Sequence, residues 1–413
     1  MTPFQLAAAL LTLVALVGWG NVKTLRLPNG VAMMIAGLLG ALILFAMQRL
    51  NLGAHIVAQI GDTVRHIDFA QTVVGYMLAF LLFAGAMQVD LTAMRNNWMS
   101  VAALATLGVA GSIVIVGFGA YYIARALGVA LPLPWALVFG ALISPTDPVA
   151  VLATVKHVKL SKKLQVILEG EALFNDGVGI VCFLALLALA TGTGSVAPLA
   201  VIGKVAIQAL GGLGLGAVAG WCVIRAMNTM DEFAIETTMT IALTMVVYAG
   251  AQSLGLSGAI AVVGAGMLFG GQRAKKAMEG ETEPYLRGFW TLVDEILNAL
   301  LFLLLGVEML AVPFHLNQAG LLIAVVPLVL LSRFVIVAPW GAWYSIRNAE
   351  KGAIPILGWG GLHGALSLAL ALSLPPGGPR NLILSVTYAV VAFSITVQGL
   401  TFLPLTRWLQ RQA

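Results

Sequence analysis

The sequence has 413 residues, of which 60% are hydrophobic and only 9% are charged. Soluble domains contain roughly 45–50% apolar and about 25% charged residues, so this composition excludes a set of soluble domains and indicates a polytopic membrane protein. The net charge of +5 does not predict nucleic-acid binding, because the basic residues lie in short segments between apolar runs, where they set membrane orientation. Cys182 and Cys222 lack metal-ligand spacing and predict neither a disulfide framework nor a metal site.

Apolar runs long enough to cross a bilayer recur along the chain and predict an all-α protein with thirteen transmembrane helices. We expect the first helix to be retained, because it lacks the basic start and the cleavage site of a signal peptide. The amphipathic stretch 51–66 is expected at the membrane surface. The predicted helices span residues 4–20, 28–48, 68–88, 98–124, 133–155, 162–190, 198–224, 235–253, 256–270, 290–311, 317–345, 353–373 and 382–406.

The loop charges predict the orientation. With the N-terminus outside and the C-terminus inside, sixteen of the 22 Lys and Arg residues lie in cytoplasmic loops, five lie in outer loops and Arg333 lies in a helix. This asymmetry is what the positive-inside rule expects. The longest hydrophilic segment, 271–289, is then cytoplasmic; we interpret it as a linker helix, with regulation as the alternative.

Two pairs of segments suggest an internal repeat. LLFAGAMQ at 81–88 resembles FLLLGVEM at 302–309, and the break in the fifth helix at 144–148 matches a glycine-rich break in the twelfth helix at 358–364. Both pairs are seven helices apart, an odd number, so the second copy is inverted across the membrane. Inverted repeats with interrupted helices at matching positions are typical of secondary transporters.

Four ionisable residues lie well inside predicted helices, namely Asp147, Glu171, Asp176 and Arg333. A charge near the bilayer centre costs at least about 2.5–3.5 kcal/mol, so these groups are expected to pair with one another or to handle a charged substrate. We expect Glu171 to form a structural ion pair with Arg333. Asn175, one helical turn after Glu171, is expected to hydrogen-bond to that carboxylate and orient it.

The segment Pro145-Thr146-Asp147-Pro148 interrupts the fifth helix. The two prolines remove backbone donors and free carbonyl oxygens, which can coordinate a cation where they line a cavity. Thr146 adds a hydroxyl group, and Asp147 either supplies charge or caps the half-helix that follows it. A simple proline kink is the alternative interpretation.

Asp176 is the expected binding group for both a cation and a proton. Beside the broken fifth helix it would meet oxygen ligands, which suit Na⁺, Li⁺ or K⁺ better than softer metals. Burial disfavours a charged carboxylate, so the same group can hold a proton. A single group that holds either one gives exchange; the alternative is that Asp176 only ties helices together. His363, in the glycine-rich break, is either a packing residue or a group that senses protons or repels cations.

The motifs SPTDPVAV and EGEALFNDGVGIV, with LLFAGAMQVDL, SRFVIV and GWGGLHGALSLALALSLP, resemble the cation/proton antiporter family of NhaP and NHE type. The resemblance covers about residues 70–405. It implies a 13-helix inverted-repeat fold with crossed, interrupted helices, and a homodimer. The core would comprise about 68–190 and 290–406, and the dimerisation helices about 4–48 and 198–270.

The resemblance also implies exchange of Na⁺ or Li⁺ for H⁺ in a bacterial inner membrane, by an elevator movement and without a cofactor. Asp176 would bind the cation and the proton, Thr146 and Asp147 would line the crossing, and Asn175 implies the electroneutral subtype. Two positions depart from the family pattern: Ala172 stands where a serine ligand is usual, and His363 where arginine is usual.

Several alternatives remain open at this stage. A K⁺/H⁺ antiporter would share the same fold. A cation channel is disfavoured because TVVGY at 72–76 has the wrong glycine spacing for a filter and lies inside a helix. A membrane enzyme is not expected, because GxSxG and HExxH motifs are absent from the sequence and the glycines of 211–220 fit helix packing. An organic solute is disfavoured by the ion-sized set of oxygen ligands.

Overall fold

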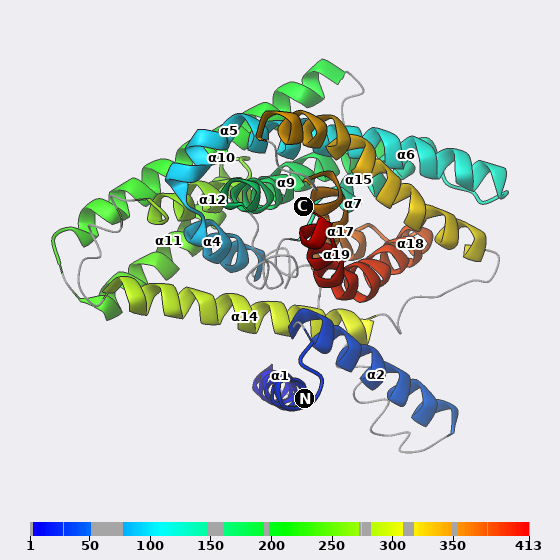
Figure 1. The fold of residues 1–413 in the computed structure, drawn as a ribbon, viewed down its shortest axis with the longest axis horizontal. Coiled ribbons are helices and arrows are strands. Elements are labelled where there is room, and N and C mark those ends of the chain that lie inside the picture. Colours follow the sequence, from blue (N-terminus) through cyan, green and yellow to red (C-terminus); the bar gives the residue numbers. More distant parts are fainter. Residues whose placement is uncertain are drawn as a thin grey trace.

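The computed structural model describes residues 3–27, 29–50, 77–147, 161–193, 198–230, 232–271, 274, 282–308, 318–348, 353–377 and 379–412. Within these ranges the secondary structure is entirely helical (Figure 1), as the composition predicts. Six of the described helices are long and apolar enough to cross a membrane, and five shorter apolar helices accompany them. The expected surface stretch 51–66 lies outside the described residues.

The helices of the first half follow the predicted spans, with two of them described only in part. The third and fifth predicted helices are described from Leu78 and up to Ile143, respectively. The described elements are α1 (Pro3–Lys23), α2 (Asn29–Arg49), α4 (Leu78–Gln88), α5 (Leu91–Ala103), the π-helical turn η2 (Leu104–Gly108), α6 (Val109–Ala126), α7 (Leu133–Ile143) and α9 (Lys162–Ala190).

The second half begins with α10 (Pro198–Met227), α11 (Phe233–Ser253) and α12 (Gly258–Phe269). The remaining elements are α14 (Thr282–Glu308), α15 (Ala319–Asn348), α16 (Ala353–Trp359), α17 (Ala365–Leu372), α18 (Arg380–Phe393), the π-helical turn η5 (Ser394–Gln398) and α19 (Gly399–Gln412). The chain passes from α5 through η2 into α6, and from α18 through η5 into α19, so each of these runs is helical without a break.

Two helices start earlier than the hydrophobic pattern predicts. α5 begins at Leu91 rather than at 98, because the Asp90 side chain accepts hydrogen bonds from the amides of Thr92 and Ala93 at 2.9 and 3.1 Å and caps the helix. α14 begins at Thr282 rather than at 290, inside the hydrophilic segment expected to be a linker. Arg287 and Glu283, one turn apart, form an ion pair at 2.9 Å on this polar first part of α14.

The helices pack closely around α9 and the broken helices. α12 packs against α10, α4 and α11. α14 packs against α2, and α7 packs against α6. The glycine-rich run of α10 serves this packing: a Cβ atom at Gly212 would come within 2.6 Å of the Ser257 carbonyl oxygen. In Figure 1, α14 runs along one edge of the molecule, with α1 and α2 on its outer side and α9 and the broken helices on its inner side.

Candidate functional site

The two helix breaks meet inside the bundle. α7 ends at Ile143 and is followed by the non-helical residues Ser144–Asp147, while the stretch 360–364 separates α16 from α17. The backbone amide of Asp147 donates a hydrogen bond to the carbonyl oxygen of Leu362 at 2.7 Å. This bond satisfies two backbone groups that a helix break would otherwise leave unpaired. The crossing therefore holds non-helical backbone in the interior, where it can line a cavity.

The side chain of Asp147 lies at the start of α17. Gly364 is the N-cap residue of that helix, and a Cβ atom there would come within 2.9 Å of Asp147 Cγ. The N-terminus of a helix carries a partial positive charge that stabilises a carboxylate. The half-helix that the sequence led us to expect Asp147 to cap lies outside the described residues. Among the described residues, the carboxylate lies at the start of α17.

A cavity of about 430 Å³ opens beside the crossing and brings the expected ion-binding residues together. Thr146 and Asp147 reach it from the break after α7, and Asp176 and Ala172 reach it from α9. Ala172 is buried and Asp176 partly exposed, so Asp176 can contact an ion that enters the cavity. The hydroxyl and carboxylate oxygens of this wall suit an alkali cation.

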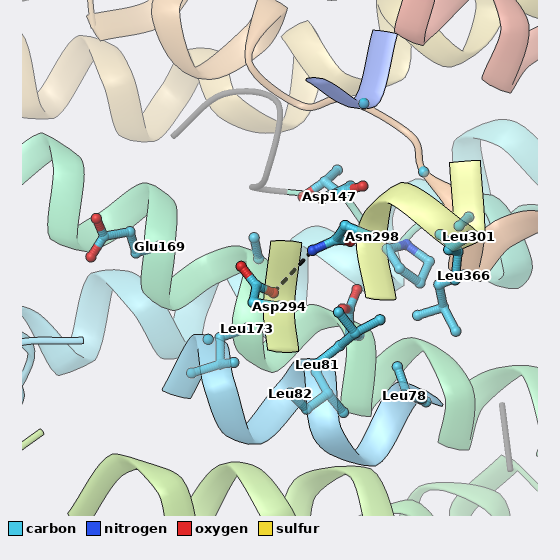
Figure 2. Close-up of a pocket in the computed structure, with 18 of the residues that line it drawn as sticks. Leu78, Leu81, Leu82, Asp147, Glu169, Leu173, Asp294, Asn298, Leu301 and Leu366 are labelled. Atoms are coloured by element: carbon cyan, nitrogen blue, oxygen red, sulfur yellow. Dashed lines mark hydrogen bonds between the residues drawn. The ribbon is translucent and has the colours of Figure 1, made fainter. Parts of the chain in front are cut away.

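Other polar residues of the cavity were not identified from the sequence. α14 contributes Asp294, Glu295 and Asn298, and α9 contributes Glu169. Asn298 is buried, and its Nδ2 donates a hydrogen bond to Asp294 Oδ1 at 2.9 Å. Figure 2 shows this pair beside Asp147, with Glu169 further along the pocket. The sequence contains a pattern that could have predicted them. Polar residues recur at helical spacing at Thr291, Asp294 and Asn298, so they share one face of α14.

Glu171 and Arg333 lie in contact between α9 and α15. Arg333 Nη2 donates to Glu171 Oε2 at 2.8 Å and Nη1 donates to Glu171 Oε1, so the pair is bidentate. Arg333 Nε also donates to the Leu357 carbonyl oxygen at 3.2 Å. The two residues are only 2% and 9% exposed. A charge in such a place is tolerated when it is paired and hydrogen-bonded.

Asn175 contacts a different residue from the one expected. We expected a hydrogen bond to Glu171, but both oxygens of that carboxylate accept from Arg333. Asn175 Nδ2 instead donates to Thr146 Oγ1 at 2.8 Å. This bond joins α9 directly to the break after α7. Asn175 immediately precedes Asp176, so the bond lies close to the proposed ion-binding carboxylate in the sequence.

His363 is buried and does not border the large cavity. Its backbone amide donates to Ser394 Oγ at 2.8 Å, and its ring hydrogen-bonds to the backbone of Ile143, the last residue of α7. The side chain borders a second, much smaller cavity together with Glu171 and Arg333. His363 thus links the glycine-rich break, the end of α7 and the π-helical turn η5.

The described residues contain no group of three or more His, Cys, Asp or Glu side chains arranged to hold a metal ion. The candidate site combines a threonine hydroxyl and a carboxylate from the break after α7 with a carboxylate from α9. Such a mixed oxygen set can bind a weakly held monovalent ion that must also leave.

Comparison with known proteins places these features in context. Residues 10–408 match the family model described as "Sodium/hydrogen exchanger, transmembrane". The Na⁺/H⁺ antiporter NhaP of Pseudomonas aeruginosa is 39% identical over 412 residues, which cover 98% of this chain and 96% of that protein. The Na⁺/H⁺ antiporter NhaH of Halobacillus dabanensis is 33% identical and covers 93% of each chain.

The fold also matches a solved structure. The sodium proton antiporter MjNhaP1 of Methanocaldococcus jannaschii superimposes with a TM-score of 0.75, covering 100% of this chain and 99% of that one at 19% sequence identity. A second structure of the same antiporter, described at pH 8, gives a TM-score of 0.72. The similarity therefore extends over the whole length of the fold.

Proposed function

The chain belongs to the sodium/hydrogen exchanger family, and from this premise we propose that it is a secondary transporter that exchanges Na⁺ for H⁺ through Asp176. The observation that carries the proposal is the shared cavity of Asp176, Asp147 and Thr146 beside two crossed helix breaks. Oxygen atoms of these three residues border the cavity in which a cation would bind, and the Asp176 carboxylate can take a proton instead.

The exchange follows from competition for one side chain. With a cation bound, Asp176 must be ionised, and with a proton bound it no longer attracts the cation. Asp147 contributes negative charge to the same cavity while the N-terminus of α17 stabilises its ionised form. Movement of the site between the two sides then carries either ion, but never both together.

The proposed stoichiometry is one cation for one proton. The residue before Asp176 is Asn175, whose uncharged amide donates to Thr146 and does not take up or release a proton at physiological pH. Asp176 is therefore the single group that changes protonation in each half of the cycle. The transport is then electroneutral, and its rate does not depend on membrane potential.

We propose that the cavity opens to the cytoplasm in this conformation. Its outer residues include Asn29 at the start of α2, Gln88 at the end of α4 and Gln165 near the start of α9. With the N-terminus outside, as the loop charges predict, these helix ends all lie on the cytoplasmic side. Exchange then requires a second conformation in which the site faces outward, reached by an elevator movement of the core.

The family likeness also supports an assembly and a location. We propose a homodimer in the bacterial inner membrane, in which α1, α2 and α10–α12 form the scaffold and the helices around α9 form the moving core. Crosslinking of the purified protein in detergent tests the dimer. No cofactor is needed by this scheme, since the cation and the proton are the cargo.

Reconstitution into vesicles with an internal pH dye tests the function. Adding Na⁺, Li⁺ or K⁺ separately to acid-loaded vesicles should raise the internal pH for each ion that is exchanged. Asp176→Asn should abolish this response while the protein remains folded, because the amide cannot bind a proton in exchange for a cation. A variant that keeps wild-type flux would exclude Asp176 as the shared group. An ion that passes without counterflow of H⁺ would indicate a channel.

A further inference from the structure

A second, much smaller cavity shares Thr146 with the large one. It has a volume of about 10 Å³, close to the smallest space that holds one water molecule, about 10–15 Å³. Its wall includes Thr146, Asn175 and His363, together with Glu171 and Arg333 of the buried ion pair. Thr146 borders both cavities. The small cavity is therefore lined in part by polar groups and shares Thr146 with the proposed ion site.

Two hydrogen-bond acceptors on this wall lack a partner among the described residues. Asn175 Oδ1 and His363 Nδ1 are both buried without a hydrogen bond, and their residues are only 2% and 4% exposed. The Asn175 amide nitrogen already donates to Thr146, and the His363 ring already bonds to the backbone of Ile143. Leaving such a buried group without a hydrogen-bond partner destabilises the folded protein.

The wall also supplies donors. Arg333 has five N–H groups, and its bonds to Glu171 and Leu357 use three of them. The hydroxyl groups of Ser144 and Ser332, which border the cavity, already donate to the carbonyl oxygens of Ala141 and Val329. The cavity thus presents two acceptors without a partner, the remaining donors of a guanidinium group and the hydroxyl group of Ser112.

We propose that one bound water molecule occupies this cavity, donates to Asn175 Oδ1 and His363 Nδ1, and accepts from Arg333. This pattern of two acceptors and one donor complements water, which has two hydrogens and two lone pairs. A cation does not fit, because it would face the guanidinium group of Arg333. A protonated His363 ring does not fit either. Its Nδ1 would carry a hydrogen and could no longer accept one from the water, and the ring would add a second positive charge beside Arg333.

The water gives His363 a positioning role in transport, a consequence that rests on the proposed function. With Oδ1 held by the water, the Asn175 amide can only turn its nitrogen toward Thr146. Thr146 Oγ1 is then fixed as an acceptor for Asn175, and its position on the wall of the ion cavity is fixed as well. Without the acceptor at 363, the amide can rotate and Thr146 loses its fixed place.

Direct imaging tests the water itself. A map of the reconstituted protein that resolves other buried waters should show one density peak between Asn175, His363 and Arg333. The peak should disappear in His363→Leu, which offers no acceptor. A wild-type map without this peak would overturn the inference, whether or not the protein exchanges Na⁺ for H⁺.

Two amide variants separate the water from the contact to Ile143. In His363→Asn the amide oxygen lies near the place of Nδ1, whereas in His363→Gln the amide nitrogen reaches the place of Nε2 and can keep the bond to Ile143. We expect His363→Asn to keep the apparent Na⁺ affinity within about twofold, and His363→Gln and His363→Leu to weaken it roughly fivefold or more. Thermal stability should follow the opposite order, with Gln above Asn. Equal loss of affinity in His363→Asn and His363→Leu would contradict the water site.

Discussion

The backbone amide of Asp147 and the carbonyl oxygen of Leu362 lie 2.7 Å apart and form a hydrogen bond between two interrupted helices from opposite halves of the chain. This bond fixes where the Asp147 side chain lies, against the N-cap residue Gly364 of α17. Asp147, Thr146 and Asp176 then border one cavity. The position of the proposed ion site therefore depends on a contact between residues more than two hundred positions apart.

Gly364→Ala should weaken cation binding with little effect on folding elsewhere. A methyl group at 364 would overlap with the Asp147 carboxylate, so that carboxylate must move away from the start of α17. We expect the apparent Na⁺ affinity to fall by about tenfold, equal to about 1.4 kcal/mol and within the range of a helix-dipole interaction in a partly buried site. Na⁺-dependent proton efflux from vesicles measures this.

Gly250→Ala is the matched control for that substitution. Gly250 lies in α11, and no atom lies within 4 Å of the place where its Cβ would be. This variant should keep wild-type affinity. The same loss in both variants would show that the methyl group at 364 does not act through Asp147.

Arg333→Ala should destabilise the protein more than any change at Asp176. Removing one partner of a buried ion pair leaves the carboxylate of Glu171 buried and unpaired, which costs about 3–5 kcal/mol. The double variant Glu171→Leu with Arg333→Leu should recover much of this loss, because no lone charge remains. Thermal unfolding in detergent gives the stability of Arg333→Ala, of Asp176→Asn and of the double variant. Equal stability of Arg333→Ala and Asp176→Asn would refute a stabilising role for the pair.

Ala172→Ser should tighten Na⁺ binding. Ala172 borders the cavity one helical turn before Asp176, and a hydroxyl group there would add an oxygen ligand without a large change in volume. We expect the apparent Na⁺ dissociation constant to fall about threefold or more, the scale of a single hydrogen-bond-sized contribution. Ala172→Gly, which changes volume without adding oxygen, serves as the control. An unchanged constant in Ala172→Ser would mean that position 172 does not contact the ion.

Asp294→Asn should slow uptake of Na⁺ mainly at low salt. Asp294 borders the cavity and is partly exposed, so its negative charge can raise the local cation concentration. We expect the Na⁺ concentration for half-maximal exchange to rise about twofold to fivefold in dilute buffer, and the difference to shrink in about 0.15 M choline chloride, which screens charges beyond roughly 8 Å.

Glu283→Gln tests whether that effect depends on position. Glu283 lies on the same helix, pairs with Arg287 and does not border the cavity. Its replacement should leave the half-maximal concentration unchanged. A salt-independent defect in Asp294→Asn would point to a structural role for its hydrogen bond with Asn298.

Charges that are rare in an apolar sequence led us to predict paired or ion-binding roles for Asp147, Glu171, Asp176 and Arg333. The structure shows the Glu171–Arg333 pair, and Asp147 and Asp176 border one cavity. Burying a charge in the membrane costs enough free energy that such a residue is expected either to be paired or to serve transport. The proline pair and the glycine-rich stretch likewise predicted both helix breaks, because proline and glycine disfavour a continuous helix. The partner of Asn175 could not be predicted, since helical spacing describes neighbours on one helix only.

Asp294 and Asn298 were missed for a simpler reason. Placing the start of the tenth helix at 290 puts Asp294 only about one turn from the predicted helix start, near the membrane surface, where an acidic residue is common. The helix begins at Thr282, so at 3.6 residues per turn Asp294 lies about three turns inside it. The first part of α14 is polar and carries the Glu283–Arg287 ion pair. A prediction from hydrophobicity therefore places the helix start too late.

Isothermal titration calorimetry of the purified protein tests competition at Asp176 most directly. Na⁺ is titrated at several pH values in two buffers with different ionisation enthalpies, so that the difference in heat gives the number of protons released. Where Asp176 starts out protonated, we predict release of about one proton per cation and a dissociation constant that rises about tenfold for each pH unit lowered. Binding that releases no protons at any pH would contradict a shared site.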